Sequence, residues 1–187
     1  MAEGLPNDAL RLENQLCFAL YAATHAMTRA YRTRLSTIGL TYPQYLVLLA
    51  LMERPLLSVT SLARLLQLDA ATLTPLLKRL ETAGLVARRR SATDERVVEI
   101  SLTAAGRTLR RDLGRIQHEV TCDSGLSPAA FAALRGTLHD LADTFTGAGT
   151  DAETPAEAAP AAEAATCAPP RPSSHARRAA KPPRDAA

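Results

Sequence analysis

The sequence predicts a mainly α-helical domain with one small β-hairpin, followed by a tail with no fold of its own. Apolar residues recur at helical spacing over most of residues 8–146. Two short apolar segments, 85–87 and 97–102, flank a polar loop and indicate the hairpin. From about Gly147 the composition changes to Ala and Pro. We therefore expect one folded domain over residues 8–146 and a tail over 147–187.

The bulk composition excludes several classes of protein. An apolar share of 47% is too high for wholesale disorder. The longest apolar stretch, Leu46–Met52, is far too short to span a membrane. The N-terminus also lacks the basic segment and apolar core of a signal peptide. We therefore expect a soluble, cytoplasmic protein that has no membrane partner.

Three cysteines stand far apart, and no CxxC pair occurs. They are Cys17, Cys122 and Cys167. An odd number of widely spaced cysteines fits neither a secreted disulfide framework nor a zinc ribbon. In the cytosol such thiols are either inert packing residues or redox-active groups. Because Cys17 lies beside an apolar helical stripe, its position alone favours packing.

The positive charge is concentrated in one segment. Between Lys78 and Arg96 six basic residues stand against three acidic ones, a surplus that equals the +3 of the whole chain. The basic residues are Lys78, Arg79, Arg88, Arg89, Arg90 and Arg96. A local basic surface of this kind favours a polyanion as partner.

Residues 148–187 are rich in Ala and contain seven of the twelve prolines. A segment with almost no large apolar side chains cannot bury enough surface to offset its chain entropy, so we expect it to be disordered. Its first half is acidic and its end is basic. The favoured interpretation is a solvating appendage, with a weak, non-specific contact to DNA as the alternative. Cys167 lies in this tail, where we expect no specific role for it.

Two helices precede the basic segment. Apolar residues at helical spacing predict one long helix over residues 8–36 that ends before Gly39. A second helix follows Thr41, with Pro43 in its first turn, where the missing N–H costs nothing. The apolar run Tyr45–Met52 indicates that this second helix is buried.

A helix-turn-helix pattern follows. Residues 58–66 form a short helix that Thr60 can cap, and residues 67–69 form a tight polar turn before the next helix. This next helix has an apolar stripe made of Leu73, Leu76, Leu77 and Leu80. Its other face and flanks carry Ala71, Thr72, Thr74, Pro75, Lys78, Arg79 and Thr82. Small, hydroxyl and basic side chains suit the major groove of DNA, although a solvated surface helix has a similar composition. Since proline in a helix interior costs about 3 kcal/mol, Pro75 predicts a late start near Thr72 or a bend.

The segment after this helix favours DNA binding. Gly84 ends the helix, and residues 85–87 start a strand. A polar basic loop over 88–96 leads to a second strand over 97–102, and Thr103 then caps a further helix. Two helices followed by a hairpin with a basic tip is the order of a winged helix-turn-helix, whose wing arginines lie near the minor groove. Double-stranded DNA is therefore the expected partner.

The last predicted helix starts at Ser127 and carries an apolar face. The face consists of Phe131, Leu134, Leu138, Leu141 and Phe145. Long terminal helices with such faces need a partner surface, and a homodimer also supplies the paired recognition helices that a palindromic operator requires. We therefore assign a DNA-binding lobe to about 41–102 and dimerisation helices to about 8–36 and 103–146.

With these segments in view, the chain resembles the MarR family of transcriptional regulators and, more closely, its organic-hydroperoxide-sensing (OhrR-type) branch. The resemblance covers about residues 10–145. The matching segments are LENQLCFALYAA around Cys17, LTYPQYLVLLAL around Tyr42, LDAATLTPLLKRLETAGLV across the recognition helix and DERVVEISLT in the wing. The first two are specific to the branch, whereas the last two identify only the broad family. The resemblance implies a repressor that binds operator DNA as a reduced homodimer and leaves it when an organic hydroperoxide oxidises the protein.

The resemblance also implies roles for individual residues. The cysteine of the first helix is the peroxide sensor in that branch, and here it is Cys17. Tyr31 and Tyr42 match two tyrosines that hydrogen-bond the sensor from the other subunit, which favours the nucleophilic thiolate. Cys122 matches the second cysteine, which condenses with the sulfenic acid in two-cysteine members. A mixed disulfide with a small thiol is the alternative end state.

On the DNA side, Asp94 resembles the family's aspartate that orients an arginine, and Arg96 resembles its minor-groove arginine. The positions that face DNA in the family correspond to Thr72, Thr74, Pro75, Lys78 and Arg79. The triple arginine Arg88, Arg89 and Arg90 makes this wing more basic than the family pattern, and its individual roles stay unassigned.

Other functions stay open on the sequence. A winged helix that answers a small aromatic ligand, a thiol peroxidase and a nucleoid-type DNA binder are the alternatives. Tyr31 and Tyr42 also suit an amphipathic interface. His118 and Cys122 have a spacing that can hold a metal on a helix, but two further ligands are missing. Because the chain has no Gly-rich phosphate loop, no Ser/His/Asp order and no paired acidic motif, we expect no enzyme, no cofactor and no metal site.

Overall fold

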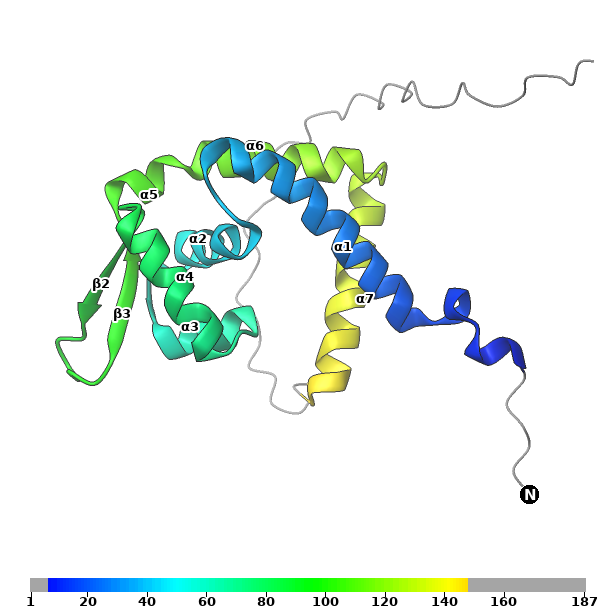
Figure 1. Cartoon of the computed structure of the whole chain (residues 1–187), viewed down its shortest axis with the longest axis horizontal. Helices are drawn as coiled ribbons and strands as arrows, with labels where there is room; N and C mark the ends of the chain where they lie inside the picture. Colours follow the sequence, from blue (N-terminus) through cyan, green and yellow to red (C-terminus); the bar gives the residue numbers. More distant parts are fainter. Residues whose placement is uncertain (1–6, 148–187) are drawn as a thin grey trace, which may run out of the picture. The chain divides into compact units, whose positions relative to one another are not determined.

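A computed structural model describes residues 7–147 of the chain (Figure 1). Within these residues the chain divides into two units, one that ends at Val120 and one that begins at Thr121. The helices are α1 (Leu16–Leu35), α2 (Tyr42–Glu53), α3 (Val59–Leu66), α4 (Ala70–Thr82), α5 (Ala104–Thr108), α6 (Arg110–Asp123) and α7 (Pro128–Thr146). The strands are β1 (Leu56–Ser58), β2 (Val86–Arg90) and β3 (Val98–Leu102). The predicted fold class, mainly helical with a small hairpin, is confirmed. The predicted tail and Cys167 lie outside the described residues.

The N-terminal segment is not one helix over residues 8–36, so that prediction is wrong. Two short 3-10 helices, Asn7–Leu10 and Leu12–Asn14, come first. Gln15 then adopts an extended backbone, and its side-chain amide donates to the carbonyl oxygens of Ala9 and Arg11. These side-chain hydrogen bonds compete with a continuous helix. As a result α1 begins at Leu16.

The turn between α1 and α2 follows the prediction. A 3-10 helix, Ser36–Ile38, ends at Gly39, whose backbone is left-handed with a φ of 72°. Such a conformation favours glycine. Thr41 then precedes α2, and its backbone N–H donates to the side-chain oxygen of Gln44 at 2.8 Å. Pro43 lies in the first turn of α2, as predicted.

The sheet has one strand that the sequence pattern did not predict. Its strand order is β1-β3-β2, with both pairs antiparallel. The missed strand, β1, is three residues long, which is too short for an alternating pattern to be recognised. The hairpin partner β2 also extends through Arg90, so residues 88–90 belong to a strand and not to the predicted loop. The loop is correspondingly shorter, and β3 begins at Val98.

The helix caps correct two further predictions. Ser58, and not Thr60, caps α3, because its hydroxyl oxygen accepts the backbone N–H of Ser61 at 3.0 Å. Asp69 caps α4 in the same way, so this helix starts at Ala70 and continues through Pro75 to Thr82. The late start near Thr72 is therefore wrong: a well-placed cap at Asp69 determines where the helix begins, even though Pro75 removes one hydrogen bond further along.

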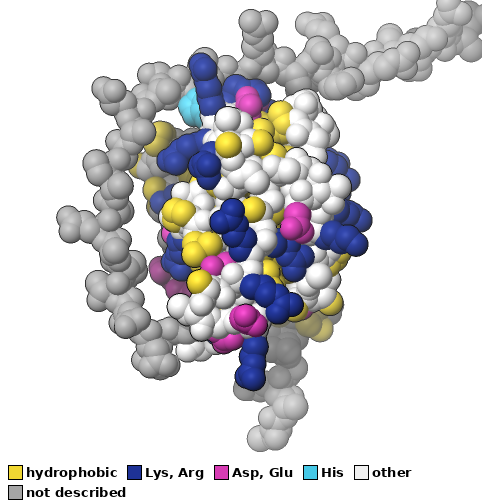
Figure 2. All heavy atoms as spheres, turned by 90° about the vertical axis from the view of Figure 1, so that its left-hand side faces the viewer, with side chains coloured by type: hydrophobic (Ala, Val, Ile, Leu, Met, Phe, Trp, Pro, Cys, Tyr) yellow, Lys and Arg dark blue, Asp and Glu magenta, His cyan; other side chains and the backbone are white. Residues whose placement is uncertain are grey.

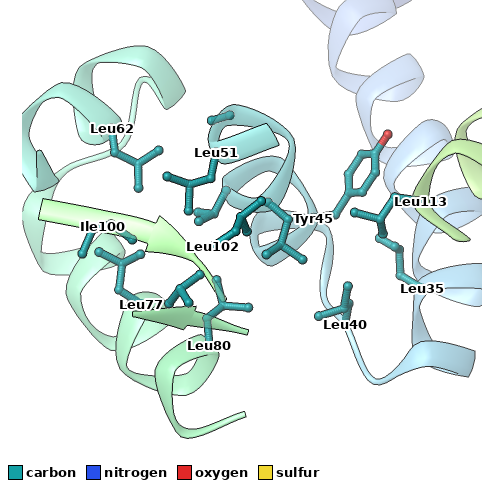
Figure 3. Close-up of a cluster of buried hydrophobic side chains, with 14 of the residues drawn as sticks. Leu35, Leu40, Tyr45, Leu51, Leu62, Leu77, Leu80, Ile100, Leu102 and Leu113 are labelled. Atoms are coloured by element: carbon teal, nitrogen blue, oxygen red, sulfur yellow. The ribbon is translucent and has the colours of Figure 1, made fainter. Parts of the chain in front are cut away.

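The core of the first unit lies between α2, α4 and β3 (Figure 3). Figure 3 shows Leu77 and Leu80 of α4 beside Ile100 of β3, and all three side chains are fully buried. Leu51 of α2 and Leu62 of α3 complete this cluster and are also buried. The predicted stripe of α4 is therefore its core face, although Leu76 is only partly buried. Because this face is committed to the core, the opposite side of α4 is left to solvent.

Large apolar side chains remain exposed on two helices of the single chain. On α1 these are Leu16, Tyr21 and Met27, and on α7 they are Leu134, Leu138 and Phe145. Ser127 caps α7 and Pro128 opens it, as predicted. Within residues 7–147 no single helix is long and apolar enough to cross a membrane. One pair of neighbouring helical segments, Leu16–Ile38 and Tyr42–Glu53, would be long and apolar enough when taken together, but the two are bent by 79° relative to each other.

The base of the hairpin is tied to α5 by Thr103, which caps that helix as predicted. Its hydroxyl donates to the carbonyl oxygen of Gly84 at 2.6 Å and accepts the backbone N–H of Gly106 at 3.0 Å. Gly106 is buried, and a Cβ atom there would lie 2.1 Å from the carbonyl oxygen of Leu85. Only glycine therefore allows α5 to lie this close to the hairpin.

Replacing Gly106 with Ala should lower the free energy of unfolding by about 1–3 kcal/mol, because the added methyl group forces the backbone apart. Denaturant unfolding followed by circular dichroism measures this change. Gly114→Ala on α6 is the matched control, since a Cβ there meets nothing within 4 Å and Ala favours a helix. Equal stability of the two variants would contradict the packing argument.

Candidate DNA interface and cysteine site

The outer face of α4 carries the residues that the sequence assigned to DNA. Thr72, Thr74, Pro75, Lys78 and Arg79 are all exposed, opposite the buried leucines. A helix that presents small and basic side chains together allows close approach to a nucleic acid and contact with its phosphates. The structure therefore places these five residues on one accessible surface.

The threonine hydroxyls of α4 already have acceptors inside the helix. The Thr72 hydroxyl donates to the Asp69 carboxylate at 3.1 Å, and the Thr74 hydroxyl donates to the Ala70 carbonyl oxygen at 2.7 Å. Asp69 also accepts the backbone N–H of Thr72 at 2.6 Å, and these hydrogen bonds hold the pKa of its carboxyl group below the usual value. The two threonines are thus oriented by the helix, with a lone pair and a methyl group left for a ligand.

The hairpin presents a second basic surface. Figure 2 views the end of the molecule that bears the hairpin and shows Lys and Arg side chains, in dark blue, spread over it. Arg89 and Arg90 at the end of β2 are exposed, whereas Arg88 is half-buried. Asp94 and Arg96 lie exposed in the loop, and the Asp94 carboxylate accepts the backbone N–H of Arg96 at 2.9 Å. Asp94 therefore orients Arg96 through its backbone, in a turn that an Asp side chain often makes.

A hollow of about 470 Å³ connects the hairpin with the start of α3. Arg88 and Arg96 line one side, and Ser58, Thr60 and Ser61 line the other. Sequence reasoning considered the segment SVTS only as a helix cap and missed that it lies beside the wing arginines. The signal that points to it is the density of hydroxyl groups, but the pairing of β1 with β3 is needed to bring the segment there.

The positive charge of this surface is not neutralised by neighbouring acids. Among the described residues, no ion pair involves Lys78, Arg79, Arg88, Arg89 or Arg96. Arg90 donates only to the carbonyl oxygen of Glu95, at 3.5 Å. Exposed cations without acidic partners are available to a polyanion.

The two described cysteines differ in state. Cys17 is a free, exposed thiol and is the second residue of α1. Cys122 is half-buried near the end of α6 and is disulfide-bonded. Since Cys17 is free, the structure of the single chain does not join these two cysteines. An exposed thiol is accessible to a reagent in solution.

The rings of Tyr31 and Tyr42, both predicted to support the sensor, lie close together, and a third tyrosine lies beside them. The ring centroids of Tyr31 and Tyr42 are 5.1 Å apart, and the ring of Tyr45 is 5.1 Å from Tyr31 and 6.0 Å from Tyr42. Burial, with a smaller contribution from Tyr31, raises the pKa of Tyr42. Burial and a side-chain hydrogen bond with Tyr31 raise the pKa of Tyr45 more strongly. The phenols of Tyr42 and Tyr45 therefore keep their protons at neutral pH. Sequence reasoning counted Tyr45 only as a core residue.

An ion pair holds the end of α1 against α6. Arg34 lies 3.1 Å from a carboxylate oxygen of Glu119, and Arg115 lies 2.8 Å from the other oxygen. Both arginines, Arg115 first, hold the pKa of Glu119 below its usual value. The pair fixes the part of α1 that carries Tyr31. Among the described residues, no group of three His, Cys, Asp or Glu side chains could bind a metal ion.

Comparisons with known proteins agree with this architecture. Residues 29–113 match the family model described as transcriptional regulator SarA/Rot. The chain is 44% identical to the organic hydroperoxide resistance transcriptional regulator of Bacillus subtilis, over 74% of this chain and 94% of the relative. It is 46% identical to the HTH-type transcriptional regulator TtmR of Methylorubrum extorquens, over 80% of this chain and 77% of the relative.

Among solved structures, reduced AbfR bound to DNA superposes with a TM-score of 0.65 at 33% identity, covering 77% of this chain and 99% of that one. AbfR is a protein of Staphylococcus epidermidis. Its overoxidised form bound to DNA superposes with a TM-score of 0.59 at 36% identity, and the match covers 73% of this chain and 98% of that one.

Helices α3 and α4, the three-stranded sheet and the basic wing define a winged-helix DNA-binding protein. The sequence identity to these relatives, and the share of each chain that the matches cover, show the family. The chain belongs to the MarR/SarA-type family of winged-helix transcriptional regulators, in its organic-hydroperoxide-sensing branch.

If Lys78 contacts a phosphate, Lys78→Ala should weaken binding to a mixed-sequence DNA duplex and make the slope of log K against log salt shallower by about one. Fluorescence anisotropy at several salt concentrations measures that slope. Arg111→Ala is the control, because Arg111 is equally cationic and exposed but lies on α6. An equal change of slope in both variants would refute a phosphate contact at Lys78.

Proposed function

We propose that this protein is a redox-responsive transcriptional repressor, which binds operator DNA as a reduced homodimer and is released when an organic hydroperoxide oxidises Cys17. The observation that carries the proposal is the free, exposed thiol of Cys17 at the start of α1, in a chain that also has an uncompensated basic wing. The protein acts in the cytoplasm and consumes peroxide once per thiol, without enzymatic turnover.

The relatives support both halves of this proposal. The Bacillus subtilis relative is named an organic hydroperoxide resistance regulator. AbfR has been solved bound to DNA in a reduced form and in an overoxidised form, so a change of redox state and DNA binding occur in one protein. The same combination in this chain makes Cys17 the natural link between peroxide and DNA.

The homodimer follows from the exposed apolar face of α7 and the exposed apolar side chains of α1. Leu16 and Tyr21 on α1 are 61% and 60% exposed, and Phe145 on α7 is 81% exposed. Apolar faces of this size are stabilised by a second copy, which also pairs two recognition helices for a palindromic site. We assign the DNA-binding lobe to about residues 41–102 and the dimer contacts to about residues 8–36 and 103–146.

On DNA, we place the outer face of α4 in the major groove. Thr72, Thr74 and Pro75 then approach the base edges, while Lys78 and Arg79 contact phosphates. In the wing, Arg96 enters the minor groove, with Asp94 holding its backbone. Arg88, Arg89 and Arg90 add contacts to flanking phosphates, where the electrostatic potential of DNA is most negative.

The chemical step is a two-electron oxidation of sulfur. The thiolate of Cys17 attacks the distal oxygen of the hydroperoxide, the O–O bond breaks, and the alkoxide takes a proton and leaves as an alcohol. The product is a sulfenic acid on Cys17. Tyr31 and Tyr42 of the partner subunit donate hydrogen bonds to the sulfur, which favour the thiolate over the thiol.

The sulfenic acid then reacts with a second thiol. The reduced Cys122 sulfur attacks the Cys17 sulfur, a disulfide forms, and the hydroxyl leaves as water with the Cys122 proton. We assign this disulfide to two different subunits. Joining α1 of one subunit to α6 of the other then changes the spacing of the two winged lobes.

A ligand-responsive regulator is the second candidate. The observation that favours it is a hollow of about 200 Å³ between α2 and α4, lined by Thr41, Gln44, Thr72 and Arg79 among others. An aromatic acid there would pair with Arg79. Under this mechanism the ligand raises the melting temperature and hydroperoxide has no effect on DNA binding.

Cys17→Ser should bind operator DNA like the wild type but no longer respond to cumene hydroperoxide, because a hydroxyl group is not an effective nucleophile toward peroxide. The operator fragment is obtained by selection with the reduced wild type. For the wild type, stoichiometric hydroperoxide should lower affinity roughly tenfold or more. Release of the Cys17→Ser protein by hydroperoxide to the same extent would refute Cys17 as the sensor.

Cys122→Ser should abolish the disulfide-linked dimer that forms when the fully reduced protein meets hydroperoxide. Non-reducing electrophoresis measures the dimer, and mass spectrometry of the linked peptides identifies its cysteines. Cys167→Ser is the matched control and should retain the dimer. If Cys122→Ser still gives a linked dimer and Cys167→Ser does not, the resolving cysteine is Cys167.

A further inference from the structure

The first half of the outer face of α4 carries four exposed side chains, and two of them are purely apolar. The four are Ala71, Thr72, Thr74 and Pro75. Ala71 presents a methyl group, and Pro75 presents the CH₂ groups of its ring. Pro75 also has no backbone N–H, so it removes the helix hydrogen bond that the carbonyl oxygen of Ala71 would otherwise accept. The proline thus adds an acceptor to this face and no donor.

The two threonines donate their only hydroxyl protons inside the helix. The Thr74 hydroxyl donates to the carbonyl oxygen of Ala70 at 2.7 Å, and the Thr72 hydroxyl donates to the carboxylate of Asp69 at 3.1 Å. A carbonyl oxygen and a carboxylate can only accept, so the direction of both hydrogen bonds is fixed. Each threonine is left with an oxygen lone pair and a methyl group. The four side chains of the first half of α4 therefore form a donor-free surface.

Pro75 connects the donor-free surface with two hollows. It lines a hollow of about 440 Å³ together with Lys78 and Arg79, and it also lines the hollow of about 200 Å³ together with Thr72. Its ring is therefore a wall shared by both hollows. Because the charged donors Lys78 and Arg79 follow it along the helix, a ligand over the first half of α4 contacts acceptors and carbon atoms, and the side-chain donors come only beyond them.

Base pairs differ in what their edges present to such a surface in the major groove. Thymine presents a methyl group and one acceptor, adenine an amino group and one acceptor, cytosine an amino group, and guanine two acceptors. A surface of acceptors and methyl groups can accept from the adenine amino group and pack on the thymine methyl group. Against a G·C pair it leaves both guanine acceptors without a donor, and an unpaired buried acceptor is unfavourable.

We propose that the donor-free surface determines the specificity of α4: it selects A·T pairs at the operator positions that it faces. Pro75 packs on a thymine methyl group, and the hydroxyl oxygen of Thr74 accepts from an adenine amino group. This inference rests on the proposed function, which places the outer face of α4 in the major groove. Lys78 and Arg79 add affinity through phosphates, which carry no information about the base pair.

The test of the methyl contact is a double-mutant cycle between Pro75→Ala and the replacement of single thymines by deoxyuridine in the operator. Deoxyuridine lacks only the methyl group of the base, so base pairing is kept. The operator is selected from random duplexes with the full-length, reduced wild type, and fluorescence anisotropy at fixed salt measures affinity. Alanine at position 75 restores a helix hydrogen bond, so this variant should be at least as stable as the wild type.

At one thymine of a half-site, deoxyuridine should lower the affinity of the wild type about three- to fivefold, the effect of one buried methyl group. The same replacement should lower the affinity of Pro75→Ala less than twofold, roughly, because the ring that packs on the methyl group is gone. Exchange of this A·T pair for G·C should weaken binding by the wild type roughly five- to a hundredfold.

Thr74→Val tests the acceptor. Valine keeps the branched shape but removes the oxygen, so binding to the selected operator should weaken roughly three- to tenfold, with affinity for a mixed-sequence duplex unchanged. Thr82→Val is the matched control. Thr82 is also exposed on α4 and donates to the carbonyl oxygen of Lys78 at 2.9 Å, but it lies at the C-terminal end of the helix, away from the residues that read bases. Its substitution should leave both affinities unchanged.

Two results would overturn the inference while leaving the proposed function intact. In the first, a specific operator is selected, but no deoxyuridine replacement weakens the wild type more than it weakens Pro75→Ala. In the second, Thr74→Val binds this operator as tightly as Thr82→Val does. If the selection gives no preferred sequence at all, the sequence-specific repressor and this inference fall together.

Discussion

The burial of one face of α4 in the core that it forms with α2, α3 and β2 is the contact on which the rest of this molecule depends. Leu73, Leu77 and Leu80 are fully enclosed, and each contributes about 1.5–3 kcal/mol relative to an exposed side chain. Exposed hydrogen bonds and ion pairs contribute less. The leucines therefore determine the orientation of the helix. The polar face with Lys78 and Arg79 lies on the opposite side and points to solvent as a result.

The same core links α4 to the helices that carry the residues of the proposed redox sensor. Tyr31 on α1 and Tyr45 on α2 belong to the buried cluster that includes Leu77 of α4. On the other side of the lobe, Thr103 and Gly106 join the hairpin to α5, which leads directly into α6. Close-packed interiors transmit small displacements rather than absorb them. A displacement of the tyrosine cluster is thus transmitted to the elements that set the position of α4 and the wing.

Several parts of the fold were predictable because their signals are local. The leucine stripe of α4, the cap of Thr103 and the Ser127 start of α7 each follow from residues within one or two turns. The errors have equally physical causes. The helix predicted over 8–36 was too long at its N-terminal end. Periodicity does not reveal that the side-chain amide of Gln15 donates a hydrogen bond to the backbone before α1. The strand β1 was missed because its three residues become a strand only through pairing with β3.

The sequence alone determined the order of the elements, the basic segment and the family pattern around Cys17, since these depend on residue type and spacing. Tertiary structure decided which hydroxyl groups lie beside the wing arginines, that Arg88–Arg90 belong to a strand, and that the rings of Tyr31, Tyr42 and Tyr45 meet. Each of these requires two segments distant in sequence to meet, and the packing of the whole core determines that meeting. For Tyr45, the local pattern shows only an apolar helix, and the fold brings its ring against those of Tyr31 and Tyr42.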